Sequence, residues 1–251
     1  SSIPNFILQL FAIWLLEVVL SVNPYLTYLL AAIFPLPIMF ALVLHAMRAE
    51  KYKKETEKRR REKLIHIANH DPLTHLINRR RLWEHLHRCE EQKKQIGTNY
   101  VISIFDIDSF KKVNDTYGHD CGDFVLVEIS KLIKANLSDN VKFGRWGGEE
   151  FLLVFMAYSN EKAIEEVEKI RKLIDETNFD FLGTKIHITL TFGVSSSSYC
   201  EDAEHIIIDA DKQLMKGKIQ GKNRVVARNI QKGLSENDAI FDSFIDSSHK
   251  D

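Results

Sequence analysis

The chain has 251 residues, which is enough for one domain of ordinary size with additional segments. The formal net charge of −1 hides a local asymmetry, because residues 48–63 hold nine Lys or Arg against four Glu and follow an almost wholly apolar region. A basic run beside an apolar run indicates a membrane edge, so no nucleic-acid partner is expected. The scattered cysteines form no CxxC pair and the histidines no HExxH, which argues against a disulfide framework and a zinc site.

Residues 1–47 are predicted to be a membrane region with two transmembrane helices that contact the lipid bilayer. The first apolar stretch is Ile3–Val22, and the second, which has no Asp, Glu, Lys or Arg, is Tyr25–Met47. A helix rises about 1.5 Å per residue, so about 20 residues cross the hydrocarbon layer. Pro35 and Pro37 are expected to kink the second helix near its middle.

Glu17 lies within the first apolar stretch, where a carboxylate in lipid is costly. Two interpretations stay open: a sensory or bundle-facing residue, and a residue near the headgroups of a tilted helix. A cleaved signal peptide is disfavoured, because no basic segment precedes the stretch and a second span follows. The basic cluster after Met47 predicts that the C-terminal part faces the cytoplasm. The Ser-Ser start is consistent with a fragment of a longer sensor.

Residues 48–69 are predicted to continue the second span as a helical stalk. This segment is rich in Lys, Glu and Arg, and no Gly or Pro occurs before Pro72. Its apolar residues are sparse, which leaves two interpretations: a short parallel coiled coil, and a solvated helix with salt bridges.

Residues 70–230 have the pattern of a globular domain in which strands and helices alternate. Short β-branched and aromatic runs predict strands, and apolar residues at helical spacing predict helices. A Gly-Gly pair at 147–148 is typical of a β-hairpin turn. The predicted strands are Tyr100–Asp106, Val141–Trp146, Glu149–Met156, His187–Ser195 and Asn223–Ala227, and the predicted helices are Leu73–Glu91, Asp120–Asn136, Glu161–Asp175 and Ala203–Gly217.

This order of elements predicts an α/β (α+β) sandwich, with a mixed central sheet of about five strands and flanking helices. Residues 231–251 predict a polar C-terminal tail that has little apolar surface to bury.

Two acidic pairs stand at predicted strand ends. Asp106 and Asp108 close the first strand of the domain, and Glu149 and Glu150 follow the hairpin glycines. Clustered carboxylates suit hard divalent cations, and Mg²⁺ in particular is held by one or two carboxylates and substrate phosphates. Glycines let a backbone approach a phosphate or a base closely. On spacing alone, an ordinary type I′ turn flanked by surface acids explains the pattern equally well.

Several motifs of this domain match one known family in order and spacing. The segment Gly147–Phe151 (GGEEF) matches the signature of the GGDEF family of diguanylate cyclases, and the match extends over about residues 68–228. The chain resembles this family, which implies a palm-like nucleotidyl-cyclase fold. The other matching segments are HDPLT (70–74), NRR (78–80), FDIDSFKKVND (105–115), YGHD and GD (117–123), TLTFG (189–193) and KxxGxN (218–223), with departures at His75, Ile77, Thr191, Gly217 and Lys222.

The resemblance implies a metal-dependent active site. It assigns Mg²⁺, with Mn²⁺ as an alternative, to Asp106, the Ile107 carbonyl and Glu149, and it places Glu150 beside them as a further ligand. Asp106, Glu149 and Glu150 are thereby the expected catalytic residues.

The resemblance also implies a GTP site. A carboxylate that faces the N1–H and amino group of guanine favours GTP over ATP. Replacing the usual arginine by Lys222 keeps the charge but loses the planar fork, so weaker triphosphate binding is expected. The implied guanine ligands are Asn114 and Asp123, and the residues implied around the phosphates are Phe110, Lys111, Gly147, Gly148, Lys218 and Lys222.

The implied reaction condenses two GTP molecules into cyclic di-GMP and two pyrophosphates, by attack of each 3′-hydroxyl on the other's α-phosphate. One domain binds one GTP, so a homodimer is expected, with the membrane helices and stalk as the control element. Together with the two apolar stretches and the basic cluster, the resemblance predicts a multi-pass protein of the bacterial inner membrane with a cytoplasmic catalytic domain. Ser138 and Val141 occupy the positions of the family's Arg-x-x-Asp product-inhibition site, so feedback through that site is not expected.

Four other functions are less consistent with the sequence. A degenerate GTP-binding receptor and a non-enzymatic membrane scaffold are both disfavoured, because every acid and glycine of the signature is present. A mixed cyclic dinucleotide product is disfavoured by Asp123 at the guanine position. A P-loop NTPase is excluded, because no GxxxxGK[ST] occurs.

Overall fold

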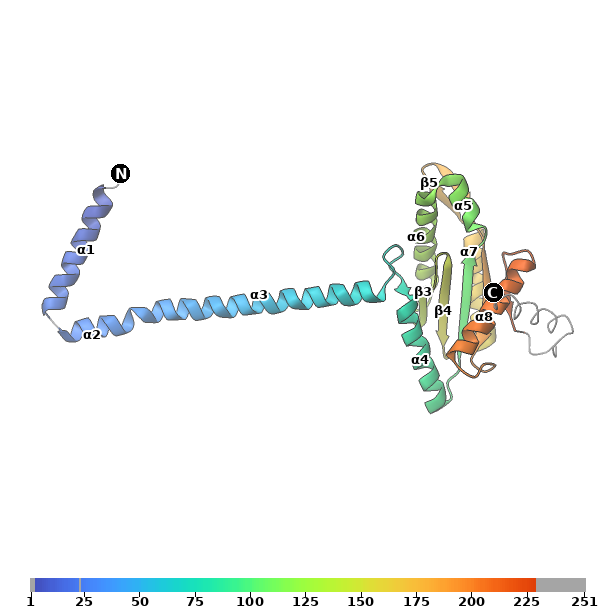
Figure 1. Ribbon diagram of the computed structural model, residues 1–251, viewed down its shortest axis with the longest axis horizontal. Helices are drawn as coiled ribbons and strands as arrows, with labels where there is room; N and C mark the ends of the chain where they lie inside the picture. Colours follow the sequence, from blue (N-terminus) through green and yellow to red (C-terminus); the bar gives the residue numbers. More distant parts are fainter. Residues whose placement is uncertain (1–2, 23, 229–251) are drawn as a thin grey trace, which may run out of the picture. The chain divides into compact units, whose positions relative to one another are not determined.

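The computed structural model describes residues 3–22 and 24–228, and the chain divides into two compact units at Ile65/His66. The first unit contains α1 (Ile3–Val22), α2 (Pro24–Ile33) and most of α3 (Pro35–Asn69), which are labelled in Figure 1. The predicted kink is confirmed, because the second apolar stretch is interrupted by a turn at Phe34, directly before Pro35. The predicted tail, 231–251, lies outside the described residues.

Large apolar side chains of the first unit whose burial is described lie on the surface. Trp14 is 57% exposed and Phe40 is 65% exposed, and α3 has no buried residue. Among the described residues, one helical segment, Ala31–Asn69, has the length and composition to cross a membrane, and a shorter apolar helix covers Ile7–Val18. Of the two predicted spans, this finding supports one.

The second unit is built on a six-stranded mixed sheet in the order β1-β3-β4-β2-β7-β8 (Figure 1). The two outer pairs, β1 with β3 and β7 with β8, are parallel, and the three inner pairs are antiparallel. The strands are β1 (Ile77–Asn78), β2 (Tyr100–Ile107), β3 (Val141–Arg145), β4 (Glu150–Met156), β7 (Leu190–Ser196) and β8 (Val225–Ala227). The predicted fold class is confirmed, with a short β1 added at one edge.

Helices cover both faces of this sheet, and each face has its own apolar core. On one face, Val125 and Ile129 of α6 (His119–Asn136) and Val167 of α7 (Asn160–Asp175) pack against the sheet. On the other face the core comes from α4 (Arg79–Ile96) and α8 (Ala203–Ile219). Central strand β2 is therefore buried along its whole length, as expected of a strand covered on both sides.

Close packing of α8 on the sheet depends on one glycine. A Cβ at Gly193 in β7 would lie 2.1 Å from the Ala210 carbonyl oxygen and 2.3 Å from the Leu214 nitrogen. Because no side chain fits there, α8 lies directly on β7, and its C-terminal end reaches the end of the sheet that carries the acidic residues. The Lys218 side chain at this helix end contacts Asp106.

The structure differs from the predicted elements in four places. The strand predicted over His187–Ser195 begins later, because β7 starts at Leu190 and His187 belongs to a separate hairpin. The helix predicted from Leu73 begins at Arg79, because Asp71 accepts hydrogen bonds from the Leu73 and Thr74 backbones and holds residues 71–74 in a turn. A short helix, α5 (Phe110–Tyr117), precedes α6, and Gly118 separates the two. A separate hairpin of β5 (Asn178–Phe181) and β6 (Thr184–His187) follows α7.

Candidate active site

Three acidic residues lie near one another where β2 ends and the antiparallel β4 begins. Asp106 of β2 lies opposite Glu150 of β4 in the antiparallel register, and Glu149 immediately precedes β4. Asp106 is only 7% exposed. Burial raises the pKa of each of the three carboxyls, and the Asp106 charge raises the pKa of Glu149 and Glu150 further. The cluster thus combines one buried and two partly buried acids, and a cation would stabilise their charges.

The β3–β4 connection presents this cluster through its two glycines. The Trp146 and Gly147 N–H groups both donate to the Glu150 carbonyl, at 2.8 Å and 3.1 Å. Neither glycine has a positive φ, so the type I′ alternative is wrong. A Cβ at Gly147 would lie 2.8 Å from Glu150 Oε2, whereas Gly148 has open space around its Cα. A bound group can therefore approach the backbone at Gly148.

Arg145 fixes this connection from behind. Its Nε and Nη2 donate to the Gly148 carbonyl at 3.0 Å and 2.7 Å, and its Nη1 lies 3.0 Å from Asp71 Oδ1. Burial tends to raise the pKa of Asp71, but hydrogen bonds from Thr74 and from Arg145 outweigh it and lower that pKa. The first motif of the domain, at 70–74, is thereby tied to the glycine turn 74 residues later.

Two lysines approach the cluster and the start of α5. Lys218 Nζ lies 3.0 Å from Asp106 Oδ2, and Lys222 Nζ donates to Ser109 Oγ at 2.9 Å. Ser109 directly precedes α5, whose first backbone N–H groups carry partial positive charge. Lys111 is exposed there, but the Phe110 side chain is 6% exposed and belongs to the core, so only its backbone faces this site.

The two residues expected at the guanine are neighbours through Gly122. A Cβ at Gly122 would lie 1.9 Å from Asn114 Oδ1, so the Asn114 side chain packs against the bare backbone next to Asp123. Asn114 comes from α5 and Asp123 from α6, and Asp123 is exposed. The site therefore has an amide on α5 and a carboxylate on the first turns of the following helix, α6.

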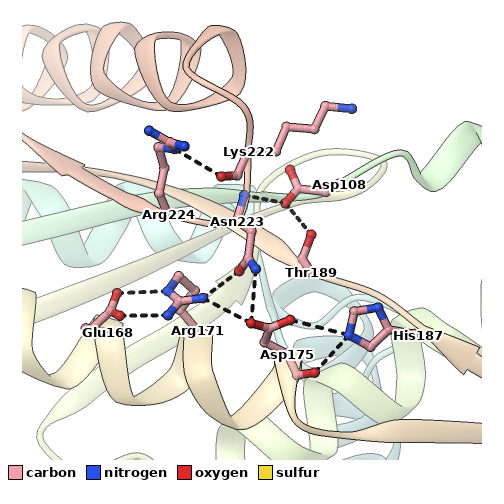
Figure 2. Close-up of polar contacts among 9 residues, drawn as sticks. All are labelled: Asp108, Glu168, Arg171, Asp175, His187, Thr189, Lys222, Asn223 and Arg224. Carbon is pink, nitrogen blue, oxygen red and sulfur yellow. Dashed lines mark hydrogen bonds and ion pairs between the residues drawn. The ribbon is translucent and has the colours of Figure 1, made fainter.

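Asp108 plays a different part from Asp106, although only Ile107 separates them. Its carboxylate accepts from Thr189 Oγ1 at 2.7 Å, from Thr191 Oγ1 at 2.6 Å and from the Asn223 N–H at 3.0 Å. Figure 2 shows Asp108 between Thr189 and Asn223. All these partners belong to the protein, so Asp108 serves the structure of the site.

The residues present fit a hard divalent cation that shares its ligands with a substrate. Within residues 3–22 and 24–228, no three His, Cys, Asp or Glu side chains converge closely enough to hold a metal alone. The acidic cluster offers oxygen donors only, and Lys218 is the cation in contact with Asp106. Magnesium is usually held in this way, by one or two carboxylates with water and phosphate completing its shell.

Similarity to known proteins identifies this unit. Residues 68–224, more than half of the chain, match the family model described as "Diguanylate cyclase, GGDEF domain". The chain belongs to the GGDEF family. Curated relatives include "Diguanylate cyclase A" of Treponema denticola, 38% identical over 167 residues (64% of this chain, 45% of the relative), and "Diguanylate cyclase" of Vibrio cholerae, 39% identical over 165 residues (65% and 51%). The chain thus spans about half the length of these relatives.

Solved structures of GGDEF domains have the same fold. The coiled coil and GGDEF domain of DgcB from Caulobacter crescentus, solved in complex with c-di-GMP, is 28% identical with a TM-score of 0.69, covering 74% of this chain and 99% of that one. The active GGEEF domain of a diguanylate cyclase from Vibrio cholerae is 36% identical with a TM-score of 0.57, covering 61% and 98%.

This GGDEF domain brings most of the predicted site residues into one region. Sequence reasoning missed the pairing of Arg145 with Asp71 and the structural role of Asp108. It also missed Arg171 and Asp175 of α7, which contact Asn223 of the last motif. Both lie on the polar side of an amphipathic helix, where no local pattern separates them from ordinary surface charges.

The positions that correspond to the product-inhibition site lie elsewhere in this GGDEF domain. The Ser138 hydroxyl lies 3.1 Å from the Tyr158 hydroxyl, and Val141, the first residue of β3, is 8% exposed. Neither side chain carries a charge that could bind the guanine or phosphate groups of a dinucleotide.

Proposed function

We propose that this chain is a diguanylate cyclase that condenses two GTP molecules into cyclic di-GMP and two pyrophosphates. The observation that carries the proposal is the acidic cluster of Asp106, Glu149 and Glu150 beside Lys218, at the edge where the glycine turn is open. The family and the named relatives support the reaction class. An arrangement of buried acids, an open glycine backbone and two lysines suits metal-assisted phosphoryl transfer.

The chain's own residues supply binding, charge and orientation. Asp106 and Glu149, with the Ile107 carbonyl and Glu150, would hold a Mg²⁺ or Mn²⁺ ion, which when bound polarises the α-phosphate and favours the 3′ alkoxide. Lys218 and Lys222 face the triphosphate from the end of α8, and the α5 N–H groups at Phe110 and Lys111 complete its cradle. Gly147 and Gly148 let the phosphates approach the turn.

Asn114 and Asp123 select guanine in this proposal. The Asp123 carboxylate accepts from the N1–H and the 2-amino group of guanine, and adenine lacks that pair of donors. Because Gly122 admits the Asn114 side chain beside it, both groups can face the edge of one base. GTP is therefore preferred over ATP.

Two copies of the domain must meet for turnover. In this proposal one site holds one GTP, so each 3′-hydroxyl has to attack a nucleotide held by the partner. We infer a homodimer controlled by the helices that precede the domain. The apolar helical segment Ala31–Asn69, which is long enough to cross a membrane, and the basic run 48–63 support a membrane anchor with the domain in the cytoplasm. We propose that Ile3–Val22 is a second span, which would make this a multi-pass protein of the bacterial inner membrane.

The direct test is incubation of the purified chain with GTP and Mg²⁺, followed by mass spectrometry of the products. We expect cyclic di-GMP from the wild type and none from Asp106→Ala or Glu149→Ala. Glu161→Gln, an exposed acid at the start of α7, serves as the matched control and should retain activity. Equal turnover in all variants would refute the assignment of the acids.

We also propose that product does not inhibit through the Ser138 region. Initial rates measured with added cyclic di-GMP should be unchanged at micromolar product. Inhibition that disappears in a Ser138→Ala variant would contradict this expectation.

A further inference from the structure

The loop between α8 and β8 has an unusual backbone. Gly221, Lys222 and Asn223 have φ angles of 110°, 61° and 46°, so three consecutive residues are left-handed or nearly so. Glycine adopts such angles freely, but a residue with a side chain is disfavoured there by roughly 1–2 kcal/mol. A conformation of this kind persists only where the surroundings fix it. Lys222, the proposed triphosphate ligand, is in the middle of this strained segment.

Asn223 is the residue that the surroundings hold. Its N–H donates to Asp108 Oδ2 at 3.0 Å, its Oδ1 accepts from Arg171 Nη1 at 2.6 Å, and its Nδ2 donates to Asp175 Oδ2 at 3.0 Å. Figure 2 shows the Asn223 side chain between Arg171 and Asp175, with its backbone at Asp108. Both polar atoms of the amide and the backbone N–H are therefore satisfied.

The partners of Asn223 are themselves fixed. Arg171 forms a two-pronged ion pair with Glu168, in which Nε and Nη2 lie 2.9 Å and 2.8 Å from the two carboxylate oxygens. The hydrogen bond from Asn223 is the largest of the influences that lower the pKa of Asp175. The amide is thus clamped between a cation and an anion of α7, a helix that carries none of the proposed substrate ligands.

The contacts of Asn223 with Arg171 and Asp175 affect the positions of two lysines. Lys222 N–H donates to the Gly217 carbonyl at 3.0 Å, which joins the loop to the last turn of α8 that carries Lys218. Lys222 Nζ reaches Ser109 Oγ, and Lys218 Nζ reaches Asp106 Oδ2. Through these contacts, the position of Asn223 sets the position of the ammonium of Lys222 over the start of α5.

We propose that Asn223 is a positioning residue, which clamps the loop between Asp108 and the Arg171–Asp175 pair and so holds Lys222 at the triphosphate. This inference rests on the proposed function, since Lys222 is assigned there as a phosphate ligand. Lys222 contacts the phosphates before and during reaction, so loss of its position raises KM for GTP more than it lowers kcat.

The test compares steady-state kinetics of Asn223 variants in two backgrounds, wild type and Lys222→Ala. Asn223→Ala should raise KM for GTP roughly tenfold and change kcat less than about threefold. Asn223→Gly keeps the left-handed backbone but loses both side-chain bonds, so it should resemble Asn223→Ala. Asn136→Ala, an exposed asparagine in the last turn of α6, is the control and should leave KM unchanged.

A swap of donor and acceptor provides the rescue. Asn223→Asp alone places its carboxylate beside that of Asp175 and should raise KM for GTP. Adding Asp175→Asn restores the pattern, because the new carboxylate at 223 accepts from Arg171 and the new amide at 175 donates to it. The double variant should regain most of the wild-type KM. Thermal unfolding of every variant shows whether the kinetic effect is separate from folding.

The decisive outcome is the dependence on Lys222. If Asn223 acts through Lys222, the Asn223→Ala change should have little further effect on KM once Lys222 is alanine. The same rise in KM in both backgrounds would overturn the proposal, as would a lower melting temperature with unchanged KM. A wild-type chain that neither binds GTP in calorimetry nor makes cyclic di-GMP would instead overturn the proposed function, and this inference with it.

Discussion

Asp106 of the acidic cluster and Asp108 of the neighbouring hydrogen-bond network are separated in the sequence only by Ile107. The two carboxylates differ in the partners that surround them. In the cluster, Asp106 contacts Lys218, and the pKa values of Asp106, Glu149 and Glu150 are all raised, mainly by burial. Asp108 accepts two hydroxyls and one backbone N–H. An acid that accepts few hydrogen bonds from the protein is available to bind a ligand. A neighbouring acid whose oxygens already accept hydrogen bonds from the protein supports the structure instead.

The largest expected effect is a loss of cyclic di-GMP formation when Asp106, but not Asp108, is treated as the metal-binding acid and is replaced. Asp106→Asn should reduce cyclic di-GMP formation by about 100-fold or more, because a carboxylate that would hold the divalent cation at the phosphates is lost. Thermal unfolding of the same variant should remain cooperative. Product formation is measured by chromatography at saturating GTP, and full activity in Asp106→Asn would remove the distinction between the two regions.

Asp108→Asn should act mainly on stability. Replacing a carboxylate that accepts three hydrogen bonds with an amide should lower the free energy of unfolding by about 1.5–3 kcal/mol. Urea unfolding followed by circular dichroism measures this change. Asp115→Asn, an exposed aspartate of α5, is the matched control and should unfold like the wild type.

Asp71 provides a second case of a scaffold acid, and its effect should depend on pH. Its pKa is lowered in the fold, so its contribution is present above the unfolded-state value and is lost as the pH falls through the folded-state value. Asp71→Asn should therefore destabilise by roughly 1–2 kcal/mol at pH 7, and the difference from wild type should shrink below about pH 4. A difference that stays constant from pH 7 to pH 3 would contradict the ion pair with Arg145.

The smallest expected effect is a gain in stability. Glu149 has a raised pKa, so its charge opposes folding above that pKa and does so less as the pH falls. Glu149→Gln should raise the melting temperature by a few degrees at neutral pH while abolishing turnover. Calorimetry with and without Mg²⁺ checks this, since added Mg²⁺ should stabilise the wild type more than the variant. A lower melting temperature would show that the cluster is not strained by its own charges.

Much of the catalytic unit followed from local patterns. Continuous apolar runs predicted β2 and β4, and helical spacing of apolar residues predicted α7, each to within one residue at either end. The α4 boundary was missed because the turn at 71–74 depends on Asp71 hydrogen bonds, which apolar spacing does not report. The hairpin β5–β6 was missed because its short strands alternate weakly between buried and exposed residues.

The sequence by itself determined the main strands and helices of the domain, the acids at the strand ends and the family motifs, because these are local features with fixed spacing. Only the tertiary structure decided that Asp108 is satisfied by Thr189, Thr191 and Asn223, while Asp106 meets Lys218. Two aspartates in the motif FDID have identical local chemistry. Their partners lie more than 80 residues further along the chain, so only the packing of β7 and α8 against β2 can distinguish a ligand from a support.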